Sequence, residues 1–240
     1  MGTSADRTTG RGGDWTPLKV ATTSYVRGLS RTGSKERAER VVARHVAVLG
    51  GAATAASTGV AGIRGIRRLG ALLSGFATEG VRLTLDSLGL VQLVGQDRFV
   101  VLDELVTFIG GNGDDLDAQA ARDAGCDILD ELFGDADSWQ ELAGVGVTEA
   151  ELKNLLERFL ALYIYNRMPV VAERLSRLDP AAQRQADQQM RDIIEDLVGI
   201  TLPNSVGNID WEGAQGKAIA ESAMGSAYEA ISALDAKDHA

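Results

Sequence analysis

The segment GLSRTGSK, residues Gly28 to Lys35, comes close to the sequence of a phosphate-binding loop. That loop needs Lys directly after its second Gly, followed by Ser or Thr, so that the amine meets the phosphates and the hydroxyl meets Mg²⁺. Here the order is Gly33-Ser34-Lys35, and no apolar strand precedes the segment. The reversed order carries the lysine onto the following element, so we do not expect nucleotide hydrolysis.

Groups for nucleophilic or thiol chemistry are few. His45 lies in a helical stripe with no evident hydroxyl or thiol partner in the sequence, and His239 lies at the other end of the chain. Cys126 is the single cysteine, which excludes an internal disulfide and a Cys-based zinc site. We expect Cys126 to be a small buried residue, His45 to be a partly buried helical residue, and the chain to contain no catalytic residues.

Two charged clusters have ordinary structural explanations. Asp114, Asp115 and Asp117 lack the alternating acidic positions, the central glycine and the distant glutamate of a calcium loop, so they predict a helix cap. Another cluster, Arg64, Arg67 and Arg68, shares one side of a predicted helix but has no interleaved aromatic residues for base stacking. We interpret it as a polar helix face, and we expect neither a metal nor a cofactor.

The N-terminus is the more informative place for chemistry. The chain begins Met1-Gly2, a start from which the methionine is readily removed, and removal would expose a free amine on Gly2. An α-amine has a pKa near 8, so a useful fraction is unprotonated and nucleophilic at neutral pH. Myristoylation requires Ser or Thr at residue 6, where this chain has Asp6, so we do not expect lipidation.

Charge and composition divide the chain unevenly. Residues 1–68 contain 12 Lys and Arg against 4 Asp and Glu, for a net charge of +8, whereas the remainder contains 12 against 30, for −18. Residues 1–33 are rich in Gly, Ser, Thr and Arg without a sustained period, which predicts a flexible basic N-terminal arm. The acidic remainder would repel nucleic acid, so a nucleic-acid partner is not expected for it.

The elements that carry these residues are predicted to be helices. Ser34 is a candidate cap for a helix of about fifteen residues, Thr148 and Glu151 form a capping box, and Asp179-Pro180 marks another helix start. Apolar residues recur at helical spacing through most of the chain after residue 33. The predicted fold class is therefore all-α, an irregular multi-helix bundle over residues 34–240 behind the arm.

One uncharged stretch, Val46 to Ile63, is 18 residues long, which is the lower limit for a membrane span. Its centre consists of Gly, Ala, Ser and Thr, which are weakly lipophilic, so we do not interpret it as a span. With a single thiol and no apolar secretory leader, the chain is expected to be cytoplasmic and free of membrane partners.

Several segments resemble the QatB family of the bacterial Qat anti-phage defence system. They are the MGTS opening with its Gly-rich arm, the helix ending near Ile109, the segment GGNGDDLDAQAARDA from Gly110 to Ala124, and the helix after Thr148. The resemblance implies an operon that also encodes an ATPase, a QueC-like enzyme (QatC-type) and a nuclease-like protein.

The resemblance further implies a role for the first residues of the chain. The QueC-like partner would bind this chain and join a deazaguanine group to the amine of Gly2, with Thr3 and Ser4 as recognition contacts. The protein would then be a substrate and an interaction scaffold rather than an enzyme. Two alternatives remain open, which are a generic helical adaptor and a nucleic-acid-associated accessory protein that uses the basic arm.

Overall fold

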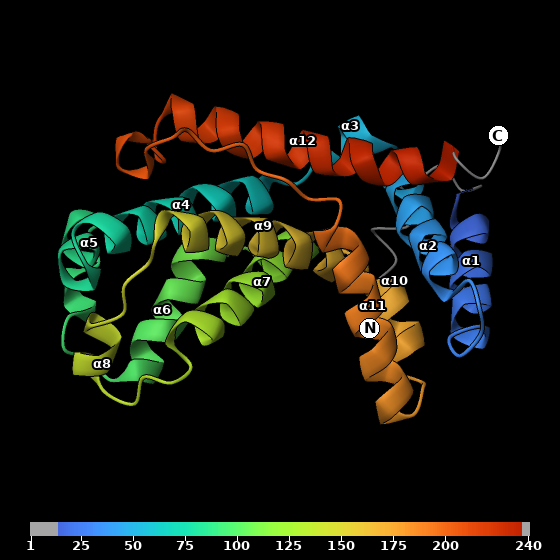
Figure 1. Cartoon of the computed structure of the whole chain (residues 1–240), viewed down its shortest axis with the longest axis horizontal. Helices are drawn as coiled ribbons and strands as arrows, with labels where there is room; N and C mark the ends of the chain where they lie inside the picture. The colour runs from blue at the N-terminus through green and yellow to red at the C-terminus, as the bar shows by residue number, and fades with distance from the viewer. Residues whose placement is uncertain (1–13, 237–240) are drawn as a thin grey trace. The chain divides into compact units, whose positions relative to one another are not determined.

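The computed structural model describes residues 14–236, and within that range its regular elements are all helices (Figure 1). The predicted all-α class is confirmed. Gly2, Thr3, Ser4 and His239 lie outside the described residues.

The described chain forms two compact units, where the sequence had indicated a single helical domain from residue 34 onward. The first unit holds the chain up to Gly59, then Arg167–Gly199, and the chain from Met224 onward. The second unit holds Val60–Asn166 and Ile200–Ala223. Its helices are α4 (Val60–Thr78), α5 (Val81–Ser87), η2 (Val91–Leu93), α6 (Arg98–Gly110), α7 (Leu116–Phe133), α8 (Trp139–Ala143), α9 (Glu149–Asn166), η3 (Val206–Asn208) and the start of α12 (Ala214–Ala236).

The first unit is organised around α2. Its helices are α1 (Trp15–Arg27), α2 (Ser34–Val48), α3 (Ala52–Ser57), α10 (Pro169–Leu175), α11 (Pro180–Glu195) and the end of α12. Helices α1 and α11 both pack on α2, and α10 contacts α1 and α11. Figure 1 shows α1 and α2 lying side by side.

Helix α1 corrects the predicted arm, because 13 of the 33 residues expected to be flexible, Trp15–Arg27, are helical. Leu18, Thr22 and Tyr25 recur at i, i+4 and i+7, so they share one helical face, and all three are fully buried. The Tyr25 hydroxyl lies 3.1 Å from the carbonyl oxygen of Ala186 in α11, to which it donates a hydrogen bond. Buried contacts of this kind stabilise the helix despite its Gly-, Ser- and Thr-rich surroundings. Any arm is therefore shorter than residues 1–33.

The start of α2 differs from the prediction in its capping residue. Ser34 is the first residue of the helix rather than its cap, and Gly33 precedes it with φ +78°, in the left-handed region that glycine adopts without strain. The Ser34 hydroxyl instead donates to Gln189 Oε1 of α11 at 2.7 Å. The serine thus joins two helices of the first unit.

The other predicted helix starts are confirmed. The Thr148 N–H donates to the Glu151 carboxylate at 2.8 Å, and the Glu151 N–H donates to Thr148 Oγ1 at 3.2 Å, which completes the capping box. Asp115 accepts from the Ala118 N–H at 2.7 Å at the start of α7. Asp179 accepts from two backbone N–H groups, each at 3.1 Å, at the start of α11.

The core of the second unit depends on close packing along α4, which contacts α6, α7 and α9. Two buried glycines of α4 leave room for aromatic rings. A Cβ atom at Gly65 would lie 2.9 Å from Cε1 of Phe159, and one at Gly70 would lie 2.8 Å from Cε2 of Trp211. Both distances are shorter than ordinary van der Waals contact, so neither position accepts a side chain unless the ring moves.

The uncharged stretch from Val46 to Ile63 is not one continuous helix. It contains the end of α2, the short α3 and the start of α4. Gly50 and Gly51, with φ of +92° and +90°, break the chain between α2 and α3. Among the described residues, no helix combines the length and the apolar character that crossing a membrane requires.

His45 is enclosed in the first unit, with 4% of its surface exposed. Burial, and next the positive charge of Arg167, lower the pKa of His45 to about 4, and the nearby backbone carbonyl of Arg167 opposes this shift. The imidazole is therefore neutral at pH 7. The His45 side chain is therefore more fully buried than the partly buried histidine that the sequence predicted.

Replacing Gly65 by Ala should lower the free energy of unfolding by about 1–3 kcal/mol, because the added methyl group displaces the Phe159 ring. The matched control is Gly225→Ala in α12, where a Cβ atom would meet no atom within 4 Å. The control should leave stability unchanged or raise it by up to about 1 kcal/mol, because alanine favours a helix interior over glycine. Urea unfolding followed by circular dichroism measures both, and equal effects in the two variants would contradict the packing argument.

His45 should make stability depend on pH. Its pKa is lower in the folded chain than in the unfolded chain, so the unfolded state takes up the proton first, and stability is lost as pH falls from about 6.5 towards 4. Between pH 7.5 and 5 the wild type should lose about 2 kcal/mol more than His45→Leu, which has no titrating group there. Chemical denaturation at several pH values gives the free energy of unfolding as a function of pH for the wild type and for His45→Leu. The same dependence on pH in both proteins would show that His45 does not titrate as described.

Candidate functional site

The candidate site begins at the N-terminal edge of the first unit. Gly2, Thr3 and Ser4 belong to the residues that precede the described chain, which starts at Asp14. Helix α1 follows immediately at Trp15 and is fixed on α2. The position of α1 therefore determines where the first thirteen residues are attached.

A turn between two helices occupies the segment that resembles a phosphate-binding loop. The Arg37 Nη2 atom donates to the carbonyl oxygens of Gly28 at 2.7 Å, Thr32 at 3.0 Å and Arg31 at 3.1 Å. A Cβ atom at Gly28 would lie 2.7 Å from Arg37 Cζ, so the glycine leaves space for the guanidinium. Lys35 points elsewhere and pairs with Asp196 at 3.4 Å. The turn presents a cation to its own carbonyl groups rather than to a phosphate.

The arginine cluster of α4 is engaged within the second unit. Arg67 donates from Nε to the carbonyl oxygen of Trp211 at 3.1 Å. Arg68 donates to the carbonyl oxygen of Phe108, and its guanidinium lies 4.9 Å from the centre of the Phe108 ring. Arg64 lies against the turn that follows α6. The Phe108 carbonyl is in the last turn of α6 and has no intrahelical partner, so Arg68 satisfies it, while Arg67 joins α4 to the segment that precedes α12.

The acidic cluster also stabilises helix starts. Asp115 caps α7, and Asp117 accepts hydrogen bonds from the Ala61 N–H at 2.7 Å and from the Tyr163 hydroxyl. Asp117 thus accepts from a backbone N–H group in the first turn of α4 that has no intrahelical partner. In this way it joins α7 to α4 and α9. Asp114 is exposed. Across residues 14–236, no three His, Cys, Asp or Glu side chains are grouped in a way that could hold a metal ion.

The two remaining reactive groups are poorly placed for catalysis. Cys126 is exposed on α7, which corrects the expectation of a buried residue. Partial burial, followed by the charges of Asp127, Asp130 and Asp123, raises the pKa of the Cys126 thiol, which keeps the thiol protonated and weakly nucleophilic at neutral pH. His45 is enclosed and cannot reach a substrate in solution.

The sequence missed one surface, the outer face of α1, because it was assigned to the arm. Lys19, Val20 and Arg27 are exposed there, on the side opposite Leu18 and Tyr25. The apolar spacing of residues 18 to 25 was the signal that could have predicted an amphipathic helix. This outer face belongs to the helix that directly follows the first described residue, Asp14.

Comparison with known proteins assigns the chain to a family. A protein-family model described as Qat anti-phage system associated protein QatB matches residues 50–231, which is 182 of the 240 residues. The match begins after α2, so the α1–α2 hairpin precedes it. No curated protein and no solved structure matches the chain. Because the match covers about three quarters of the sequence, including the Gly110–Ala124 segment, the chain belongs to the QatB family of the Qat anti-phage system.

Proposed function

We propose that the protein is a non-enzymatic, cytoplasmic component of the Qat system that presents its own N-terminus to a partner enzyme. The partner is a QueC-like enzyme (QatC-type), and the group presented is the amine of Gly2 after removal of Met1. The product is a deazaguanine-type adduct on that amine. The operon ATPase and the nuclease-like protein are further partners.

The observation that carries this proposal is the QatB match over residues 50–231. The described residues support it in a second way, because several of the groups considered for chemistry have another role. Arg67 and Asp117 bind backbone groups near helix ends, and His45 is buried and neutral. The N-terminal amine is left as the reactive group that the sequence indicates.

The chemistry of an amine suits the proposed transfer. An unprotonated α-amine attacks an activated carbonyl carbon, a carbon–nitrogen bond forms, the amine loses a proton, and the activating group leaves. Glycine leaves the amine unhindered, and Thr3 and Ser4 offer small hydroxyl groups for contacts beside it. The partner supplies activation, and this chain supplies the nucleophile.

Docking by the helical units would make the transfer efficient. Gly2 is twelve residues from Asp14, so the amine reaches at most about 40 Å from the start of α1. Once the folded part of the chain is bound, the amine samples a limited volume around the active site, and its effective concentration rises. The nucleic-acid accessory role would use the basic arm alone, because Arg67 and Arg68 of the other basic cluster bind carbonyl groups within the chain.

Co-expression with the QueC-like enzyme should increase the intact mass of the protein, and the increase should map to the N-terminal peptide. Gly2→Leu should retain Met1 and abolish the modification, because a bulky second residue blocks methionine removal. Gly2→Ala should still lose Met1 and keep an accessible amine. Intact-mass and tandem mass spectrometry measure all three outcomes.

Gly10→Leu is the matched control, because it makes the same change in the same segment without altering the terminus. It should be modified like the wild type. An unchanged wild-type mass beside a demonstrably active partner enzyme would refute the proposal, as would a modification that maps to an internal residue.

A further inference from the structure

The outer face of α1 forms one wall of a shallow groove. Thr16, Val20 and Thr23 line it from the helix, and the turn that follows α1 closes its far end. The groove has a volume of about 530 Å³, and most of its wall is apolar. A second groove of about 460 Å³ shares Thr16, Val20 and Ser24 with the first, so the two grooves adjoin along α1.

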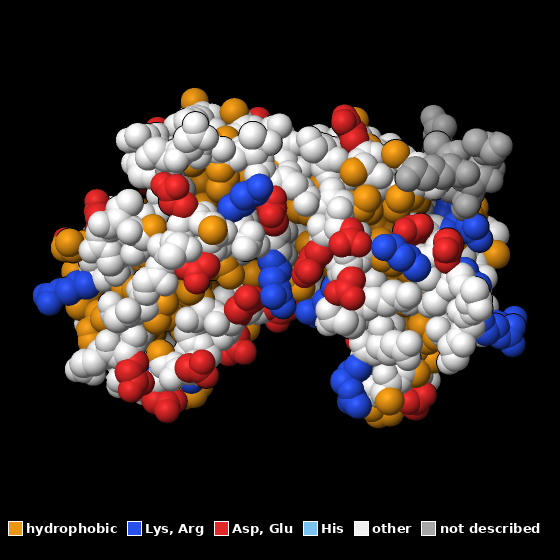
Figure 2. All heavy atoms as spheres, viewed as in Figure 1, with side chains coloured by type: hydrophobic (Ala, Val, Ile, Leu, Met, Phe, Trp, Pro, Cys, Tyr) orange, Lys and Arg blue, Asp and Glu red, His pale blue; other side chains and the backbone are white. Residues whose placement is uncertain are grey.

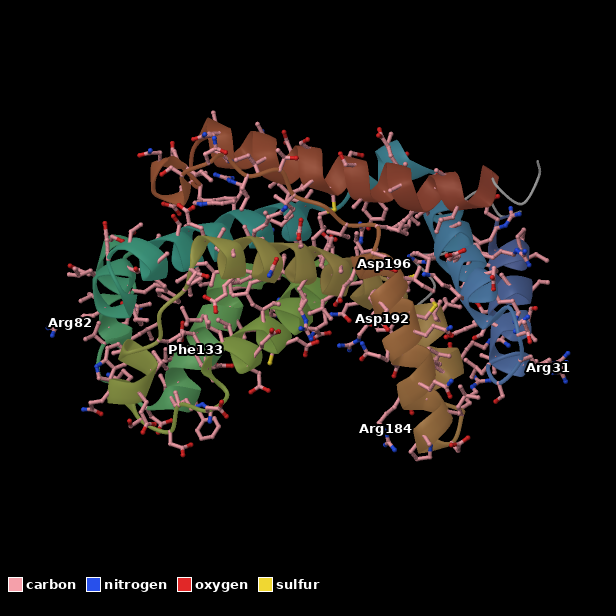
Figure 3. All side chains as sticks on the ribbon, viewed as in Figure 1. Arg31, Arg82, Phe133, Arg184, Asp192 and Asp196 are labelled. Carbon is pink, nitrogen blue, oxygen red and sulfur yellow. The ribbon has the colours of Figure 1, made fainter. Side chains whose placement is uncertain are left out.

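Cations surround the first groove. Lys19, Arg27 and Arg31 line it together with Arg37. Arg37 is occupied by the carbonyl groups of the turn, whereas no described acidic side chain pairs with Lys19, Arg27 or Arg31. Figure 3 shows Arg31 extending from the turn away from the helices, and Figure 2 shows basic side chains over α1 and α2. The groove therefore combines an apolar floor with cationic edges that have no counter-ion within the described chain.

Val20 adds an apolar contact at the centre of this surface. Its exposed fraction is 63%, which is high for a β-branched residue in a helix that is otherwise anchored by burial. An apolar centre with a charged rim is the usual composition of a protein–protein interface. A groove made for single-stranded nucleic acid would instead place aromatic rings along the cationic track.

The charges of the chain itself narrow the choice of occupant. Residues 1–13 contain Asp6, Arg7 and Arg11, for a net charge of +1, so they do not complement a cationic groove. An acidic partner would be attracted to the basic first 68 residues and repelled by the remainder, which carries −18. In the second unit, Figure 2 shows acidic side chains gathered near the ends of α6, α7 and α8. The cations that line the α1 groove would therefore attract an acidic partner, whereas the acidic side chains of the second unit would repel it.

From this geometry we infer that the α1 groove is the docking site for an acidic segment of the enzyme that modifies the N-terminus. The inference rests on the proposed function, because it names the surface by which that enzyme is held. An apolar side chain of the segment contacts Val20, and its carboxylates pair with Lys19, Arg27 and Arg31. Gly2 is fourteen residues from Thr16, so the amine extends at most about 50 Å from the groove.

The test is a double charge reversal, Lys19→Glu/Arg31→Glu. This variant leaves Arg27 in place at the end of α1. It should weaken binding of the QueC-like enzyme about tenfold or more, mainly through slower association. The difference in affinity from the wild type should be larger at low salt, where charges are less screened. Modification of Gly2 should slow at limiting enzyme and recover at high enzyme concentration, because the amine itself is unchanged. Biolayer interferometry and time-resolved intact mass give the two readouts.

The matched control is Arg82→Glu/Arg184→Glu, which changes the net charge equally at two exposed arginines, on α5 and α11, that do not line the groove (Figure 3). It should bind the enzyme within about twofold of the wild type. Circular dichroism confirms that both double variants are folded. A third variant, Val20→Ala, removes only the apolar contact and should weaken binding without altering its salt dependence.

The outcomes separate the two proposals. If wild type is modified and Lys19→Glu/Arg31→Glu binds and reacts equally well, the docking site is wrong and the proposed function stands. If wild type binds the enzyme but gains no mass, the proposed function fails, and loss of that binding in the double variant still supports the groove. Self-association lost in the double variant, seen by light scattering, would overturn the inference in favour of a second copy. Retention of DNA or RNA of defined length through these residues, with enzyme binding unaffected, would overturn it equally.

Discussion

Arginine side chains that bind backbone carbonyl groups join several helix ends and turns of this structure to neighbouring elements. Helices leave their last carbonyl groups without intrahelical partners, and a short helix has proportionately more of them. Arg37 serves this need after α1, Arg68 at the end of α6, and Arg122 beyond α6, where it donates to Gly111 and Gly113 at 2.7 Å each. A guanidinium can bond several carbonyl groups at once because its five N–H groups spread in one plane, and a lysine amine could not replace that geometry.

This use of arginine also explains why charge patterns in the sequence were open to a second interpretation. Arg64, Arg67 and Arg68 were expected to form a polar helix face, with contact to nucleic acid or anionic lipid as the alternative. The structure places Arg67 and Arg68 on carbonyl groups that come from distant parts of the sequence, and no local pattern predicts such partners. Lys19 and Arg31 were assigned to a flexible arm, yet they lie at a groove beside a well-anchored helix. The chain thus uses some cations internally and leaves others available to a partner.

Local signals predicted what local interactions determine. The capping box at Thr148 and the helix starts at Asp115 and Asp179 follow from residues within three positions of each other, and all three are present. Helix α1 was missed because its stability comes from Tyr25 and Leu18 packing in the first unit, which a composition rich in Gly, Ser and Thr conceals. Division into two units could not be predicted either, because each unit combines segments that are far apart in the sequence. The proposed Gly2 site rests on the sequence and the family alone.

The glycines of α4 carry a consequence for how the QatB fold can diverge. Gly65 and the Phe159 ring fill one space together, and Gly70 shares another with the Trp211 ring. Neither member of a pair can become larger without displacing the other, so an alanine at residue 65 costs stability unless residue 159 carries a smaller side chain. Evolutionary drift at these positions must therefore proceed by paired exchanges, and homologous chains should show correlated variation between a small residue on α4 and the aromatic residue that faces it.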